Sequence, residues 1–159
     1  MAQTIKSANA PVTLDELKNH LHMFTSDFDS SLELGLRAAV AKAEGYTNTC
    51  IWQVEQQMSV PFAKKVEVPG YNVVLSDVKV DGENVNFTYD SGVLAVDSSE
   101  GATLTYTVTQ GYNSENCPVD IKMAILLIAA KFFNNPVDSV EQLPTASQAL
   151  LHPYKVYCI

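Results

Sequence analysis

The spacing of hydrophobic residues changes twice along the chain, and these changes divide it into a helical start, a β-rich middle and a helical end. Residues 13–24 carry leucine and phenylalanine at helical spacing, behind a Thr13–Glu16 pair spaced as a capping box. Residues 30–47 repeat this arrangement, starting with the pair Ser30 and Glu33. We therefore expect helices over 13–24 and 30–47.

Short β-prone runs separated by turn residues occupy the middle of the chain, 51–110. Asp81-Gly82 lies between two such runs and is a strong hairpin signal, and Pro69-Gly70 and Ser91-Gly92 mark further turns. This section is predicted to be a small antiparallel sheet inserted between helices.

Helical spacing returns over 118–134 and, after a loop through Pro136, over a shorter segment, 143–152. Every residue of 123–130 is apolar, so the first of these helices has almost no polar side. The run is shorter than the roughly 20 apolar residues that span a bilayer, so no membrane segment is expected. Two interpretations remain open: the helix is the centre of a bundle, or one side packs in the monomer and the other meets a second copy.

These elements predict the α+β class: a helical bundle with an inserted small antiparallel β-sheet domain. We expect a short flexible N-terminal arm over 1–12 and one domain over 13–159 that contains the β insertion. The arm has one lysine and no apolar run, so it does not have the pattern of a secretory signal.

Composition narrows the possible functions. The chain has 159 residues, 47% of them hydrophobic, which is typical of a globular protein. Its net charge of −8 argues against a protein that grips nucleic-acid phosphates. Its 3 cysteines are widely and irregularly spaced, so we expect a reducing, intracellular setting without a disulfide framework.

No motif of a catalytic, cofactor or metal site is present in the sequence. His20 and His22 fall about 200° apart on a helix and so make poor ligands for one metal. Asp27 and Asp29 resemble the opening of a calcium loop, but its remaining ligands are missing, and helix capping explains them better. Cys117 precedes a helix, where a thiol can be reactive, yet a small buried residue is the simpler interpretation. We predict a protein that is not an enzyme, with no cofactor and no metal.

Six stretches occur together in an order that resembles the head-to-tail connector family of tailed bacteriophages, also called head-completion or adaptor proteins. They are TLDELKNHL, DFDSSLELGLRAAVAKAEGYTNT, VEVPGYNVVLSDVKVDGENV, TYTVTQGYN, CPVDIKMAILLIAAKFFNNP and LPTASQALLHPYKVY. The resemblance covers about Thr13 to Tyr157, and Phe133-Asn134-Asn135 is among its most telling pieces. Lys155 stands where the family commonly has arginine, and Asn135-Pro136 where its long helix more often continues.

The resemblance implies a structural virion protein without chemistry of its own. Such proteins form a ring, usually of about a dozen copies, between the capsid portal and the tail, and the ring extends the DNA channel. The implied partners are further copies of the chain, the portal protein and the next head-completion or tail protein, with DNA passing through without specific binding. The implied location is the head-tail junction of a virion assembled in the bacterial cytoplasm.

Two surfaces are predicted from these considerations. Subunits are expected to meet through small and apolar positions of the second and third helices: Leu36, Ala39, Ala43, Ile125 and Ile128. The apolar C-terminal segment is expected to dock on the portal through Tyr154, Lys155, Val156, Tyr157 and Ile159. The alternative is a small carbohydrate- or peptide-binding module that uses Trp52, Tyr71, Tyr89 and Tyr106, although aromatic residues in strands more often form core or cross-strand pairs.

Overall fold

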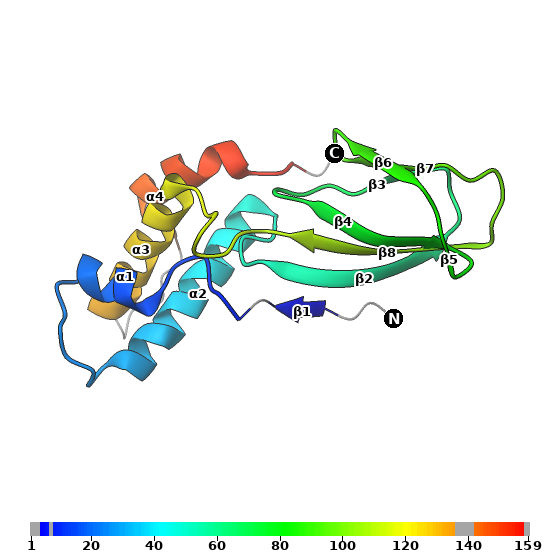
Figure 1. Ribbon diagram of the computed structural model, residues 1–159. Helices are drawn as coiled ribbons and strands as arrows, with labels where there is room; N and C mark the ends of the chain where they lie inside the picture. The colour runs from blue at the N-terminus through cyan, green and yellow to red at the C-terminus, as the bar shows by residue number, and fades with distance from the viewer. Residues whose placement is uncertain (1–3, 7, 136–141, 158–159) are drawn as a thin grey trace. The chain divides into compact units, whose positions relative to one another are not determined.

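The computed structural model describes residues 4–6, 8–135 and 142–157, and the chain divides into two compact units. The β unit comprises Met1–Ala8 and Gln53–Gly111, and the helical unit comprises Asn9–Trp52 and Tyr112–Ile159 (Figure 1). The expected α+β class is confirmed, and the β part contains two small antiparallel sheets rather than one. The assignment of 13–159 to one domain stays a prediction.

The larger sheet of the β unit has five strands in the order β1-β2-β8-β4-β5, and the smaller has three in the order β3-β7-β6. All of these pairs are antiparallel. The strands are β1 (Thr4–Lys6), β2 (Val54–Pro61), β3 (Lys65–Glu67), β4 (Val74–Val80), β5 (Glu83–Asn84), β6 (Phe87–Asp90), β7 (Val93–Val96) and β8 (Thr103–Gln110).

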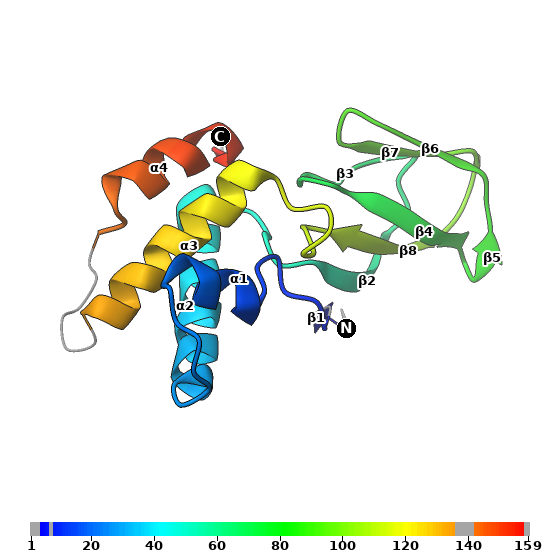
Figure 2. The same cartoon turned by 60° about the vertical axis from the view of Figure 1, so that its left-hand side comes forward.

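The small sheet lies over one face of the larger one (Figures 1 and 2). Alternate residues of β4, β7 and β8 point into the space between the two sheets, as the period of two in a strand requires. They form one hydrophobic core with Val68, made of Val78, Val80, Leu94, Val96, Leu104, Tyr106 and Val108.

Turn chemistry fixes the register of two hairpins. Asp81 and Gly82 join β4 to β5 with φ values of 51° and 90°, and Ser91 and Gly92 join β6 to β7 with 51° and 82°. Positive φ at both central residues matches the twist of a two-residue hairpin, which confirms both predicted turns. The Asp81 carboxylate also accepts hydrogen bonds from the backbone N–H groups of Ala102 and Thr103, and these bonds hold its pKa below the ordinary value.

The helical unit contains α1 (Leu14–His20), α2 (Asp29–Thr47), α3 (Val119–Asn134) and α4 (Thr145–Leu151), followed by the short 3-10 helix η1 (His152–Tyr154). α3 packs against both α2 and α4. The Thr13–Glu16 capping box forms as predicted. Partial burial raises the pKa of Glu16, but hydrogen bonds from Lys122 and from the Thr13 backbone outweigh burial and hold this pKa below the ordinary value.

Two expected features at helix ends differ from the structure. α1 ends at His20 rather than 24, because His22 adopts φ 56° and the N–H groups of His22 and Met23 bond back to Asn19 and Lys18, which closes the helix in a Schellman motif. α2 has no Ser30–Glu33 capping box, since its N-cap is Phe28 without a side-chain cap.

The N-terminal arm differs as well: Thr4–Lys6 forms β1, which pairs with β2. Residues 136–141 of the expected loop lie outside the described residues.

Candidate subunit and partner surfaces

The side chain with the clearest reactive potential, Cys117, is buried, as the simpler interpretation predicted. Burial raises the pKa of its thiol to about 12, and nearby Glu16 adds to this, whereas the positive charge of Lys122 opposes it. The thiolate is the nucleophilic form, so a raised pKa makes this cysteine inert at neutral pH.

The other candidates for metal chemistry lie around the start of α2. Asp29 does not cap α2 as expected, because it is the first residue inside the helix; its carboxylate pairs with Lys18 at 2.8 Å and lies in the first turn, where a negative charge is favourable. Asp27 does not cap α2, because Phe28 occupies that position. Within residues 4–6, 8–135 and 142–157, no three His, Cys, Asp or Glu side chains are placed to share a metal ion.

The five residues expected at a subunit interface all lie inside the helical unit. Ala39, Ala43, Ile125 and Ile128 are each 0% exposed, and Leu36 is 5% exposed. Because the monomer already covers these side chains, they do not form the surface on which a second copy would land. A subunit surface on these two helices must use their opposite sides.

The outer side of α3 is an apolar ridge. Val119 and Met123 are 76% and 41% exposed, and Leu126, Leu127 and Ala130 are half-buried. At about 100° per residue, four of these five residues fall within an arc of about 60°. We call the five together the α3 ridge. No described helix combines the length and hydropathy needed to cross a bilayer.

The outer side of α2 carries small residues. Ala38, Ala41 and Gly45 are exposed and share one line with Leu34, which is 70% exposed. Gly35 lies beside this line, and a side chain at Gly35 or Gly45 would meet no atom within 4 Å. A glycine inside a helix costs about 1 kcal/mol relative to alanine, and here no contact within the monomer offsets this. Because glycine has no side chain, nothing projects from this side of α2 at Gly35 and Gly45.

An apolar groove opens along the first half of this side, between α2 and the end of α3. It has a volume of about 460 Å³ and is lined on α2 by Gly35 and Ala38. Phe28 and Phe133 form one of its walls, with their rings packed edge to face at 6.1 Å between centroids. Leu34 and Phe28 also line this groove, and they are 70% and 49% exposed.

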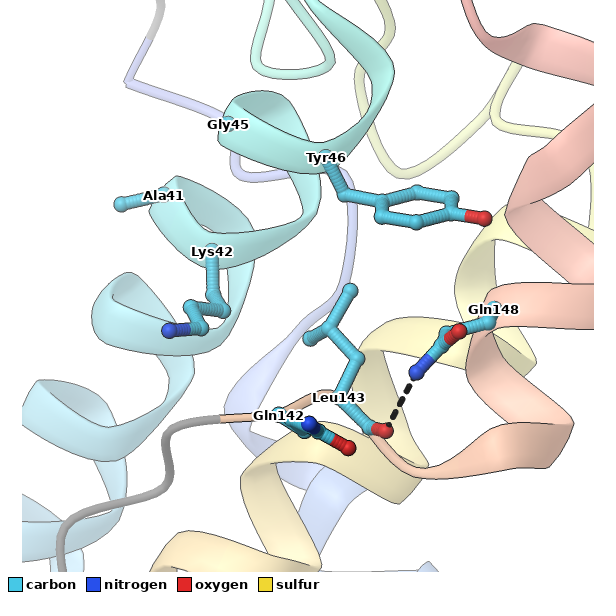
Figure 3. A pocket seen from close by; sticks show the side chains of 7 residues that line it. All are labelled: Ala41, Lys42, Gly45, Tyr46, Gln142, Leu143 and Gln148. Atoms are coloured by element: carbon cyan, nitrogen blue, oxygen red, sulfur yellow. Dashed lines mark hydrogen bonds between the residues drawn. The ribbon is translucent and has the colours of Figure 1, made fainter.

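A second groove, of about 660 Å³, opens along the other half of α2 (Figure 3). Ala41, Lys42 and Gly45 line it on α2, and the segment leading into α4 forms the facing wall. Tyr46 extends from α2 toward Gln148, whose amide donates to the Leu143 carbonyl at 2.9 Å (Figure 3). Both grooves thus have small residues of α2 as their floor. We call this floor, Gly35, Ala38, Ala41 and Gly45, the α2 trough.

The C-terminal segment is partly held by its own subunit. Val156 N–H donates to the Thr47 carbonyl at 2.8 Å, and the Asn48 amide donates to the Val156 carbonyl at 3.2 Å. The Lys155 ammonium lies 4.7 Å from the centre of the Tyr46 ring. Tyr157, by contrast, is 63% exposed. Tyr157 is therefore the described residue best placed to meet a partner, whereas Tyr154 is half-buried and Ile159 lies outside the described residues.

The aromatic residues of the alternative binding module do not gather on one surface. Tyr106 belongs to the β core, and Tyr89 packs against the same core with its hydroxyl donating to the Val68 carbonyl at 3.0 Å. Burial raises the pKa of both phenols. Trp52 belongs to the helical unit. Two of the four side chains are thus used for packing, as aromatic residues in strands commonly are.

Solved structures with the same fold come from gene transfer agent (GTA) particles. The chain matches one in the neck of an empty GTA particle computed with C6 symmetry, with a TM-score of 0.69 and 19% identity, covering 100% of this chain and 97% of that one. The neck of the native GTA particle computed with C12 symmetry gives the same values. A chain in the virion of the native particle matches with a TM-score of 0.64 and 16% identity, covering 99% and 97%.

No family model matches the sequence, and no curated protein matches it. The structural matches to the GTA necks nevertheless agree with the resemblance of the sequence to head-to-tail connectors.

Proposed function

We propose that this chain is a structural protein of a virion, located at the head-tail junction, where copies of it form a ring between the portal and the tail. The observation that carries the proposal is the likeness to neck chains over 97% or more of both chains, in structures computed with C6 and C12 symmetry. The likeness includes both units, so it does not rest on a common small motif.

A ring of identical subunits needs two different surfaces on each copy, because each subunit contacts one neighbour on each side. The helical unit offers such a pair. The buried sides of α2 and α3 face the shared core, so the α2 trough and the α3 ridge are directed away from it. A structural role without enzymatic activity is part of the same proposal, and the likeness to chains of particle necks supports it.

The partners in this proposal are the portal protein on one side and the next head-completion or tail protein on the other. The exposed Tyr157 belongs to the segment proposed to meet the portal. The net charge of −8 suits a channel for DNA, because carboxylates that face the lumen repel phosphates and let the duplex slide. Assembly would take place in the bacterial cytoplasm, before the tail is attached.

The proposal is tested by mixing the purified chain with the portal protein of the same virion and imaging the mixture by electron microscopy. Rings of the chain are expected on one end of the portal. A raised concentration of the chain should favour them, because association follows mass action. The same preparation should not retard duplex DNA at physiological salt. A chain that remains monomeric at high concentration and leaves the portal bare would refute the proposed function.

A further inference from the structure

We propose that, in the assembled ring, the α3 ridge of one copy lies in the α2 trough of its neighbour, with the two helices antiparallel. This inference rests on the proposed function, since it identifies the surfaces through which the copies meet. The occupant of the trough is a second copy of this chain.

The shapes of the two surfaces are complementary. The trough runs from Gly35 to Gly45 along α2 and has a floor of small residues, so another helix can approach it closely. The ridge runs from Val119 to Ala130 and carries bulky side chains. At 1.5 Å per residue the trough measures about 15 Å and the ridge about 17 Å, so the ridge can fill the trough over its whole length. Apart from residues at the groove itself, the large exposed apolar side chains of the helical unit are Phe24, Val119, Met123 and Tyr157, and two of these four belong to the α3 ridge.

The charges at the two ends select the antiparallel orientation. The trough has acidic side chains, Asp27 and Glu33, near the start of α2 and the basic Lys42 in its second groove. The ridge has the opposite order, with the exposed Asp120 at its start and Lys131 at its end. In the antiparallel arrangement each end meets an opposite charge, whereas a parallel arrangement would place like charges together at both ends.

Most other charged groups near the two surfaces are already engaged, whereas Arg37, exposed on α2 between Glu33 and Lys42, has no salt-bridge partner among the described residues. Lys122 pairs with Glu16 at 2.7 Å, Asp29 pairs with Lys18, and the Glu44 carboxylate accepts from the N–H groups that follow α2. Lys42 has no salt-bridge partner within 4.0 Å among the described residues. The charge pattern of the trough therefore changes from acidic at Asp27 and Glu33 to basic at Arg37 and Lys42.

Pairing Asp120 with Lys42 fixes the register. Because both helices rise equally per residue, Leu127 then lies level with Gly35 of the neighbour, and Met123 lies level with position 39, where the nearest exposed trough residue is Ala38. Bulky ridge residues thus meet the small floor residues. This register can be tested residue by residue.

The first experiment exchanges the charges. Lys42→Glu and Asp120→Lys, each alone, are expected to raise the concentration needed for ring assembly about fivefold, and the double variant should return it to within about twofold of wild type. Lys64→Glu and Asp97→Lys are matched controls, because these exposed positions of the β unit carry the same changes in charge. Circular dichroism checks that each variant remains folded. A double variant no better than either single one would overturn the register.

The second experiment joins the surfaces covalently and does not depend on charge. A chain with both Ala38→Cys and Met123→Cys, oxidised after assembly, should give a ladder of covalent oligomers, because every copy then links to two neighbours. Each single variant should give no ladder beyond the background of the native cysteines. Rings that form normally but yield no ladder would refute the ridge-in-trough contact while leaving the proposed function intact. A wild-type chain that forms no ring with its portal would instead refute the proposed function.

Discussion

Replacing Ala43 by aspartate is expected to unfold the helical unit, whereas the same replacement at Ala41 is expected to leave it folded. The two positions lie one half-turn apart on α2. Ala43 is 0% exposed and packs in the core, and Ala41 is exposed on the α2 trough. The pair therefore separates the effect of burial from the effect of placing a new charge on this helix.

The magnitude follows from two contributions at Ala43. An unpaired carboxylate in a core costs about 3–5 kcal/mol, and the larger side chain adds about 1–3 kcal/mol of overpacking because the site has no free space. A sum of roughly 4–8 kcal/mol is comparable to the whole stability of a typical domain, about 5–15 kcal/mol. The exposed Ala41 position should change stability by no more than about 0.5 kcal/mol.

Urea unfolding followed by helical circular dichroism measures the difference. Wild type and Ala41→Asp should share nearly the same midpoint, and Ala43→Asp should be unfolded or nearly so in the absence of urea. Ala43→Asn is a neutral control of the same size, and it should fall between them because it keeps the overpacking and loses the charge. Equal midpoints for the aspartate variants at 41 and 43 would show that the assigned core side of α2 is incorrect.

Three further changes test other parts of the structure. The folded-state pKa of Asp81 is lowered, so its stabilising contribution is present above the ordinary pKa of 3.8 and is lost as the pH falls below it. Asp81→Asn should therefore lower the urea midpoint of the β unit at neutral pH, and this gap should close in acid; a gap that persists in acid contradicts the assignment. Truncation after Tyr154 removes three hydrogen bonds and the cation–π contact with Tyr46, about 2–5 kcal/mol, so the thermal midpoint should fall by several degrees, whereas Tyr157→Ala should leave it nearly unchanged and weaken portal binding. Gly45→Ala should raise the free energy of unfolding by about 0.5–1 kcal/mol, seen as a higher urea midpoint, and should also raise the concentration required for ring assembly. A variant that is more stable and assembles as well as wild type would exclude close contact at this position.

The elements of the fold could be predicted where local chemistry determines them. The Asp81-Gly82 hairpin formed because both residues tolerate positive φ, and the Thr13–Glu16 capping box formed because its two hydrogen bonds are local. The end of α1 could not be predicted, since His22 closes the helix in a left-handed conformation that glycine usually supplies. The division of the strands into two sheets depends on pairing between distant segments and is not encoded in spacing alone.

The surfaces were harder to predict than the elements. Periodicity identifies the apolar sides of a helix but does not say which of two apolar sides faces the core, and α3 is apolar all round. Small alanines on α2 suggested a contact with a second copy, yet Ala39 and Ala43 serve the contact inside the monomer. For the proposed outer contact, Gly35 and Gly45 are the better signal, because they lie within α2 outside its buried side, where alanine would be more favourable for an isolated helix.

The proposed ring accounts for two features of the helical unit that are unusual for helices exposed to solvent. A helix whose outer side stays exposed to solvent normally has polar residues on that side, and a solvent-exposed helix position normally favours alanine over glycine. The α3 ridge departs from the first tendency and the α2 trough from the second. Each departure makes the isolated chain less favourable, and a single event, burial of the ridge in the trough of another copy, removes apolar surface from water and gives the glycines a packing role. Because the two surfaces differ, that contact joins copies head to tail and leaves one unused surface at each end until a ring closes.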